Sequence, residues 1–229
     1  MQNIKVIAFD ADDTLWDCQG HFELVMQELY TLLSPWVDRE TAADELFATE
    51  RKNMPLLGYG TKAFTLSMIE TALRVSHQEI SGQKLVWLQN ECYSLLKLPA
   101  TPLPEVEETL AALRRKGYRM AVFTKGELLD QENKLQRSGL GVFFEHVEIT
   151  SDKTEREFIA LCRHLNIAPE ELLMVGNSLK SDITPALAIG AQAIHIPFHV
   201  TWELEHTEHF EHPRLKHITH FNELLDILK

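Results

Sequence analysis

The chain has 229 residues and a formal net charge of −12, because 34 acidic residues outnumber 22 basic ones. This length is sufficient for a substantial hydrophobic core, in one large domain or two small ones, without disulfides or metal ions. The apolar fraction of 45% and the charged fraction of 24% are those of a globular protein and exclude a disordered chain. The acidic balance argues against nucleic acid or an anionic membrane as a partner.

The cysteines and the apolar segments indicate the cellular compartment. Three cysteines, Cys18, Cys92 and Cys162, are too few and too scattered for a disulfide framework or a zinc ribbon. Asp10 interrupts the first apolar run too early for the core of a signal peptide. No stretch approaches the roughly 18 apolar residues of a membrane span. We therefore expect a soluble, cytoplasmic protein with reduced thiols.

The first part of the chain changes character after a single strand. Ile4 to Phe9 is a short apolar run rich in β-branched residues, which predicts a buried parallel strand. Residues 17–98 contain no clear strand and show an amphipathic helical pattern interrupted by proline and glycine. The predicted helices cover residues 22–33, 38 to just before Pro55, 61–75 and 81–96.

A proline-rich segment at residues 99–104 separates this helical region from an alternating one. Strands are predicted at 118–123, 147–150, 172–175 and 193–196, and helices at 105–116, 128–137, 154–165, 183–189 and 223–228. The alternation predicts an α/β fold with a parallel sheet covered on both faces. We expect residues 1–16 and 99–229 to form this core domain and residues 17–98 to form an inserted all-helical subdomain.

Three carboxylates follow the first strand in Asp10-Ala11-Asp12-Asp13-Thr14. They repel one another, so a fold tolerates them where a cation or a function requires them. Alternation places Asp10 and Asp12 on the same side of an extended chain. The pair fits a site for a hard divalent cation such as Mg²⁺, or a division of labour between a nucleophile and an acid/base. An acidic turn without function is the alternative.

Polar residues also follow the later strands, at the sheet edge where ligands bind in α/β proteins. Thr124 precedes Lys125 and Gly126, a sequence that lets a hydroxyl and backbone N–H groups approach an anion. Asn177 and Asp182 offer oxygen ligands, although Asp182 equally fits a helix N-cap before Pro185.

Lys153 stands out by its local context. Asp152 and Glu155 predict a capping box that places Lys153 in the first turn of a helix. A cation there opposes the helix dipole, and such a misfit favours a function, with a solvated surface lysine as the alternative.

Together these residues resemble the haloacid dehalogenase-like hydrolase superfamily. The family pattern is Asp-x-Asp-x-Thr, a Thr or Ser after a strand, a Lys, and Gly-Asp-Ser-x-x-x-Asp. The match spans the whole chain and implies a Rossmann-like core with a mobile helical cap inserted after the first motif. The matching residues are Asp10, Asp12, Thr14, Thr124, Lys153, Gly176, Ser178 and Asp182.

The resemblance implies a role for each position. Asp10 is the nucleophile that forms an aspartyl-phosphate, and Asp12 protonates the leaving oxygen and then deprotonates the hydrolytic water. Thr124 and the N–H of Lys125 bind phosphoryl oxygens, while Lys153 neutralises charge around the phosphate. Because Asp12 must be protonated in the first step, we expect neighbouring carboxylates to raise its pKa.

The resemblance also implies Mg²⁺ as the cofactor, held by the Asp10 side chain, the Asp12 backbone carbonyl and the motif after Gly176. The chain departs from the pattern here, because Asn177 replaces the usual aspartate and brings an oxygen without a charge. Asp182 then coordinates directly or through water. Lys125 stands where the family often has Asn, and its side chain either adds a phosphate contact or faces solvent.

The carboxyl group of Asp12 distinguishes between the dehalogenation and phosphate-ester reactions found within the family. The family's dehalogenases lack it, because halide leaves without protonation, so Asp12 favours phosphate-ester chemistry. We expect a Mg²⁺-dependent phosphatase acting on a small phosphorylated metabolite. The alternatives are a phosphomutase or haloacid dehalogenase of the same superfamily, or a non-catalytic phosphate-binding scaffold, which Asn177 motivates. Receiver domains of response regulators are about half this length and place the phosphorylated Asp mid-chain.

Seven of the 11 histidines lie between His195 and His220. The spacing of His206, His209 and His212 matches no zinc-ligand template, and many glutamates lie nearby. We predict a solvated loop.

Overall fold

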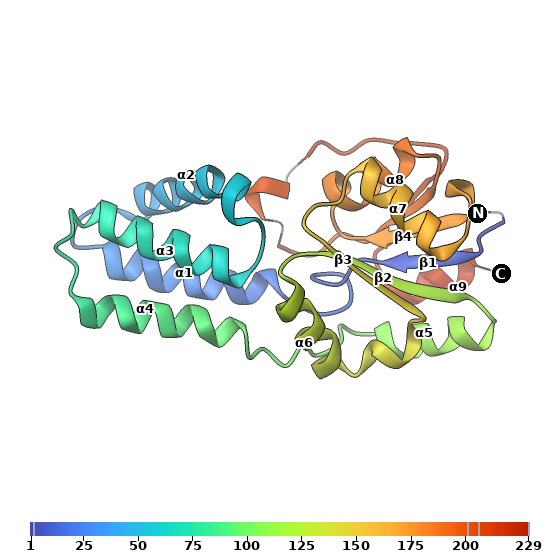
Figure 1. The fold of residues 1–229 in the computed structure, drawn as a ribbon, viewed down its shortest axis with the longest axis horizontal. Helices are drawn as coiled ribbons and strands as arrows, with labels where there is room; N and C mark the ends of the chain where they lie inside the picture. Colours follow the sequence, from blue (N-terminus) through green and yellow to red (C-terminus); the bar gives the residue numbers. More distant parts are fainter. Residues whose placement is uncertain (2, 201, 206, 229) are drawn as a thin grey trace. The chain divides into compact units, whose positions relative to one another are not determined.

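The computed structural model describes every residue except 2, 201, 206 and 229. The chain divides into two compact units, Met1–Cys18 with Ala100–Lys229, and Gln19–Pro99 (Figure 1). The first unit is the α/β unit and the second is the helical unit. Among the described residues, no helix is long and apolar enough to cross a membrane.

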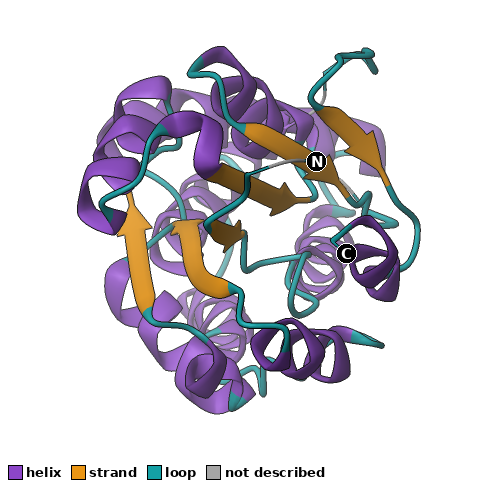
Figure 2. Cartoon of the chain, turned by 90° about the vertical axis from the view of Figure 1, so that its right-hand side faces the viewer, coloured by secondary structure: helices purple, strands orange, loops and turns teal. Residues whose placement is uncertain are grey.

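The α/β unit contains one six-stranded sheet in the order β3-β2-β1-β4-β5-β6, and all its strands are parallel (Figure 2). This confirms the predicted sheet and adds one short strand that the sequence did not indicate. The strands are β1 (Val6–Phe9), β2 (Arg119–Lys125), β3 (His146–Thr150), β4 (Leu172–Gly176), β5 (Gln192–His195) and β6 (Leu215–His217).

Helices cover both faces of the sheet, and the central strand β1 is apolar throughout for that reason. Ile7 and Phe9 join the core cluster on the face of α5 and α9, whereas Val6 and Ala8 join the cluster on the face of α7 and α8. All four side chains are fully buried. The helices are α5 (Val106–Arg115), α6 (Leu128–Ser138), α7 (Glu155–Leu165), α8 (Thr184–Ala188) and α9 (Leu224–Ile227).

The strand register determines which residues meet at the carboxyl edge of the sheet. Phe9 at the end of β1 pairs with Val122 of β2 and Val175 of β4. The segments that follow β1, β2 and β4 therefore begin side by side. The parallel partner β3 adds the segment after Thr150 to the same edge, since Thr150 pairs with Lys125.

The helical unit consists of α1 (Gln19–Leu33), α2 (Arg39–Leu57), α3 (Thr61–Val75) and α4 (Gly82–Leu95). They enclose a core cluster of their own that includes Leu29, Leu46, Met68 and Leu88. The side chains of Asp38 and Ser81 cap the N-termini of α2 and α4.

The prediction that the second helix ends before Pro55 is wrong, because α2 continues to Leu57. Proline disrupts a helix by lacking an N–H and by crowding the carbonyl four residues earlier. Here Pro55 lies in the last turn, so only one internal hydrogen bond is lost. The N–H of Gly58 then closes the helix onto the Met54 carbonyl at 2.9 Å.

Lys153 does not lie in the first turn of α7, as the predicted capping box required. Thr154 is the N-cap instead: its hydroxyl accepts from the Arg156 N–H at 3.3 Å, and the Glu157 carboxylate accepts from the Thr154 N–H at 3.3 Å. The carboxylate of Asp152 accepts from the N–H of Lys153. Lys153 is thus the residue before the N-cap, in the segment after β3.

The prediction of a solvated loop is wrong at the two ends of the histidine-rich segment, where β5 and β6 lie, whereas the described residues between them form a loop with none of them buried. His195 ends β5 with 4% of its surface exposed, and its Nε2–H donates to the Asn177 carbonyl at 2.9 Å. Leu215 in β6 and the following Ile218 are also buried. His206 lies outside the described residues.

Candidate active site

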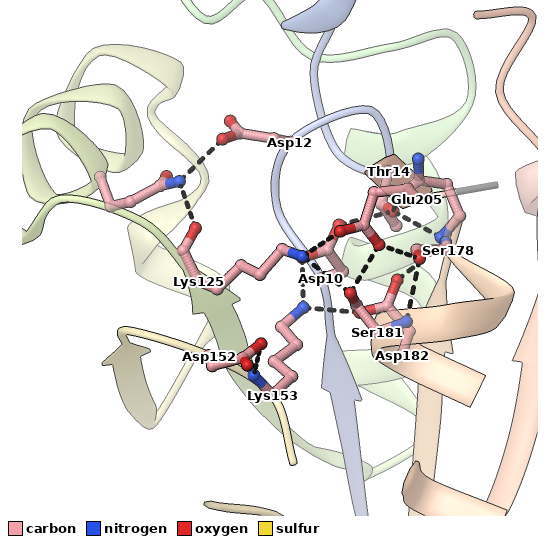
Figure 3. A network of polar contacts seen from close by, with 12 residues as sticks. Asp10, Asp12, Thr14, Lys125, Asp152, Lys153, Ser178, Ser181, Asp182 and Glu205 are labelled. Atoms are coloured by element: carbon pink, nitrogen blue, oxygen red, sulfur yellow. Dashed lines mark hydrogen bonds and ion pairs between the residues drawn. The ribbon is translucent and has the colours of Figure 1, made fainter. Parts of the chain in front are cut away.

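The candidate catalytic residues lie at the carboxyl edge of the sheet, on segments that follow four neighbouring strands. Asp10 and Asp12 follow β1, Thr124 lies at the end of β2, Lys153 follows β3, and Asn177 follows β4. Thr124 is buried at that edge. Of the predicted residues, the structure brings Asp10, Lys153, Asn177 and Asp182 into one hydrogen-bonded network together with Thr14 (Figure 3).

Lys153 links two carboxylates in the centre of this network. Its Nζ donates to Asp10 Oδ1 at 2.5 Å and to Asp182 Oδ1 at 2.6 Å. Only 1% of its side chain is exposed, so the ammonium is desolvated and pairing is obligatory. The alternative of a solvated surface lysine is therefore excluded.

The Asp10 carboxyl group lies in an acidic and dry environment. Burial and the nearby Asp182 carboxylate raise its pKa from 3.8 to about 7, against the opposing effect of Lys153. Burial alone would lower the pKa of Lys153, but the two carboxylates outweigh it and raise that pKa. A single ammonium thus serves two acids, and a further positive charge here would favour ionised Asp10.

The Asp12 carboxylate, unlike that of Asp10, is surrounded by hydrogen-bond donors. Its carboxylate accepts hydrogen bonds from Lys134 Nζ at 2.7 Å to each oxygen, from Trp16 Nε1 at 2.7 Å and from Gln131 Nε2 at 2.7 Å. Its side chain points away from the cluster around Asp10 (Figure 3). Burial raises the pKa of Asp12, but Lys134 and the other donors outweigh burial and lower it. The expectation of a raised pKa is wrong, because the Lys134 ammonium and the other donors outweigh burial.

Two residues of α6, Lys134 and Gln131, were missed by the sequence reasoning. Lys134 is 4% exposed and Gln131 is 4% exposed, although both resemble surface residues of an amphipathic helix. Gln131 Nε2 also donates to the Lys125 carbonyl at 3.1 Å, which connects Asp12 to the end of β2. Their three-residue spacing puts them on one helix face, the only signal that the sequence offered.

The Lys125 side chain faces protein and not solvent. Its Nζ donates to Ser181 Oγ at 2.7 Å and forms an ion pair with Glu205. The hydroxyls of Ser178 and Ser181 donate to the same carboxylate, each at 2.5 Å. Burial raises the pKa of Glu205, but Lys125 outweighs it and lowers the pKa. No sequence pattern had indicated Glu205.

Oxygen atoms suited to a hard cation gather beside Asp10. The Thr14 hydroxyl lies 3.2 Å from Asp10 Oδ2 and 3.3 Å from Asn177 Oδ1. It also accepts from the Asn177 N–H at 3.1 Å, which fixes the start of the motif after β4. Carboxylate and amide oxygens are ligands that Mg²⁺ accepts, so this donor set fits the ion.

Asp182 is held in place by its own hydrogen bonds. Its Oδ1 accepts from Lys153 and its Oδ2 from the Ser178 N–H at 3.0 Å. The carboxyl group packs against Gly176, where an added Cβ would lie 2.2 Å from Asp182 Oδ2. Only glycine therefore fits at the end of β4 while Asp182 keeps this position.

Comparisons with known proteins agree with this arrangement. A family model described as haloacid dehalogenase-like hydrolase matches residues 4–190. The glyceraldehyde 3-phosphate phosphatase of Methanothermobacter thermautotrophicus is 28% identical over 90% of this chain and 91% of its own length. The N-acylneuraminate-9-phosphatase of Homo sapiens is 25% identical over 84% of this chain and 82% of its own.

A solved structure is similar throughout. The crystal structure of a haloacid dehalogenase-like family hydrolase from Xanthomonas campestris has a TM-score of 0.85 and 31% sequence identity, and covers 95% of this chain and 87% of that chain. The family model and this structure both extend over most of the sequence. The chain therefore belongs to the haloacid dehalogenase-like hydrolase family.

Proposed function

We propose that this protein is a Mg²⁺-dependent phosphatase that hydrolyses a small phosphomonoester through an aspartyl-phosphate on Asp10. The observation that carries the proposal is the pair of carboxylates after β1, each paired with a different buried lysine. The phosphatase names of the relatives support the same reaction class. A phosphatase needs one carboxylate to attack and another to handle protons, and the pair offers two carboxylates in different environments.

In the first step Asp10 attacks phosphorus, an Asp10–phosphorus bond forms, and the bond to the leaving oxygen breaks. Asp12 donates a proton to that oxygen, so that an alcohol leaves. Lys153, fixed by Asp182, balances charge where the phosphoryl group meets Asp10. We assign the Thr124 hydroxyl and the Lys125 N–H to the phosphoryl oxygens, since both lie at the end of β2.

In the second step Asp12 takes a proton from water, whose oxygen attacks phosphorus and releases phosphate from Asp10. The surroundings of Asp12 favour its ionised form, because the Asp12 carboxylate accepts hydrogen bonds from Trp16, Gln131 and Lys134. This form suits the base of the second step, and the proton that Asp12 takes from water there is the proton that it gives to the leaving oxygen in the next turnover. Lys134 and Gln131 are positioning residues, because they contact Asp12 and no reacting atom is assigned to them.

Three oxygen donors would hold Mg²⁺: the Asp10 carboxylate, the Asp12 backbone carbonyl and the Asn177 side-chain carbonyl. When bound, the ion supplies positive charge that offsets repulsion between a carboxylate and a phosphate dianion. We assign Asp182 to the same site through water, since its carboxylate already accepts from Lys153 and Ser178.

The proposal is tested by phosphate release from a panel of phosphomonoesters, including glyceraldehyde 3-phosphate, with Mg²⁺ and with EDTA. We expect Mg²⁺-dependent turnover, and loss of turnover in Asp10→Asn with the fold retained by circular dichroism. Asp44→Asn, a change at an exposed aspartate of the helical unit, is the matched control and keeps activity.

Two results would contradict the proposal. If the wild-type protein releases no phosphate from any ester in the panel, the non-catalytic phosphate-binding scaffold becomes the better interpretation. If Asp10→Asn retains wild-type activity, Asp10 is not the nucleophile. Acid-quenched mass spectrometry of the wild-type protein during turnover adds a direct measurement, since a phosphoryl group on the peptide that contains Asp10 is expected.

A further inference from the structure

Two histidines and a glutamate converge at the edge strand of the sheet, on residues that the proposed function does not use. His146 and Glu148 lie on β3, and His164 lies in the last turn of α7. Glu148 Oε2 is 2.8 Å from His146 Nε2 and 2.9 Å from His164 Nδ1. The three ligand atoms all lie within 4.8 Å of one another. Three metal-binding groups from two elements therefore meet at one point.

The fold fixes the backbone positions of these three residues. His146 and Glu148 are two apart on a strand, so their side chains leave the same face. β3 is paired with β2 along its whole length, from His146 to Thr150. α7 is anchored through buried Phe158 and Leu161 and lies over that face. The convergence is thus built on a strand and a helix and not on a loop.

The donor set is selective for one class of ion. Two imidazole nitrogens and one carboxylate oxygen suit Zn²⁺ and its substitute Co²⁺, whereas Mg²⁺ prefers oxygen ligands alone. Each imidazole directs one nitrogen at Glu148 and can carry its proton on the other, which leaves a lone pair for a metal. Side-chain exposures of 31% for His146, 22% for Glu148 and 54% for His164 leave a path from solvent and room for water as a fourth ligand.

We propose that His146, Glu148 and His164 form a binding site for a Zn²⁺-class transition-metal ion, with water completing a four-coordinate shell. The site lies before the carboxyl end of β3, with Glu148 two residues and His146 four residues before Thr150, whereas Lys153 of the candidate active site follows that end. A bound ion joins β3 to α7, the two elements that flank the segment carrying Lys153. Its expected effect is a more stable α/β unit, independent of the phosphatase proposal.

The experiment uses the full-length chain, stripped of metal by a chelator and titrated with Co²⁺ and then Zn²⁺. We expect the visible absorption of four-coordinate Co²⁺ at one equivalent, which six-coordinate Co²⁺ in an all-oxygen site lacks, and its loss when Zn²⁺ is added. At a Zn²⁺ concentration 100-fold above the dissociation constant, the melting temperature rises by about 5–10 °C.

Variants assign the signal to these residues. Glu148→Gln and His164→Gln weaken Zn²⁺ binding by at least about 10-fold and remove the rise in melting temperature. Asp10→Asn tests the candidate Mg²⁺ site, and His217→Gln tests the second place where imidazoles meet, since His217 Nδ1 lies 3.1 Å from His195 Nδ1. Both of these variants keep the Co²⁺ absorption and the Zn²⁺ affinity.

The proposal is overturned if no four-coordinate Co²⁺ absorption forms, if it persists in His164→Gln, or if it disappears in His217→Gln. His164 is half-exposed, so its substitution leaves the metal-free melting temperature within about 2 °C of the wild-type value. This variant keeps the test decisive even if Glu148→Gln fails to fold. Because the readouts are spectroscopic and thermal, they do not depend on the outcome of the phosphatase assays.

Discussion

Asp10 and Asp12 follow the same strand and are two residues apart, yet their surroundings shift their pKa values in opposite directions. Asp10 shares the Lys153 ammonium with Asp182, and burial together with that second acid raises its pKa to about 7. Asp12 accepts from Lys134 through both of its oxygens and from two further donors, while Asp130 lies 3.9 Å from the same ammonium, and the pKa of Asp12 is lowered. The difference teaches that the hydrogen-bond donors at a buried carboxylate and the distance of the second acid from the shared cation, and not burial alone, decide which carboxylate carries charge.

The largest expected effect comes from removing the cation shared by Asp10 and Asp182. Lys153→Met leaves two buried carboxylates unpaired and takes away charge stabilisation at the phosphoryl group, so kcat falls by about 10³-fold. We expect an equal loss for alkyl and aryl phosphates, because the proposed mechanism gives Lys153 no contact with the leaving oxygen. Steady-state phosphate release measures it, with the exposed Lys97→Met as control. Activity within tenfold of wild type would remove Lys153 from the mechanism.

The second effect concerns Lys134, whose Nζ lies 2.7 Å from both Asp12 oxygens. Lys134→Met lets the Asp12 carboxylate turn, so kcat/KM for an alkyl phosphate falls by about 100-fold. For p-nitrophenyl phosphate, whose leaving group needs no proton, kcat/KM changes by less than about threefold. The ratio of the two substrates separates a positioning role from general damage to the fold. An equal loss on both substrates would contradict the role assigned to Lys134.

A third change adds a negative charge close to Asp10. Asn177→Asp adds a carboxylate beside Asp10 and Thr14, so the Mg²⁺ concentration for half-maximal activity falls by about 10-fold. Mg²⁺ titrations of activity measure the shift, and Asn222→Asp at an exposed position serves as control. An unchanged or higher Mg²⁺ requirement would exclude position 177 as a ligand.

The smallest effect tests one neutral donor on the Asp12 side. Trp16→Phe keeps most of the buried ring and removes the indole N–H that donates to Asp12 Oδ1. Losing one such hydrogen bond costs about 1 kcal/mol, which corresponds to about a fivefold fall in kcat/KM for alkyl phosphates. Chemical denaturation gives the accompanying change in stability. A loss as large as that of Lys134→Met would show that Trp16 holds Asp12 as strongly as the lysine does.

The sequence was sufficient for the elements that have a clear periodicity. The apolar runs of β1 and β4 are buried on both faces and the alternation of strands and helices is regular, so the parallel sheet was predictable. β6 was not, because in a three-residue strand only Leu215 is buried and no period can be seen. The continuation of α2 beyond Pro55 was not predicted for a different reason, because a proline in the last turn of a helix removes only one internal hydrogen bond.

The candidate site was predictable only where residues lie in a motif. Asp10, Lys153 and Asp182 follow strands, and the structure joins them as the order of the motifs implies. Lys134 and Glu205 lie in no motif, and their burial depends on tertiary packing that a single sequence does not show. The lowered pKa of Asp12 could not be inferred for the same reason, because its cause is Lys134.

The contacts of the two carboxylates span long stretches of chain, and this has a consequence for folding. Lys153 and Asp10 are 143 positions apart, and Lys134 and Asp12 are 122 apart. Closing loops of this length costs entropy before the contacts form, so neither pair assembles early in folding. A fragment that lacks β1 or the segments after β3 and β4 contains no complete site. We therefore expect enzymatic activity to be a late signal during refolding, one that appears only after the segments that follow β1, β3 and β4 have met at the same edge of the sheet.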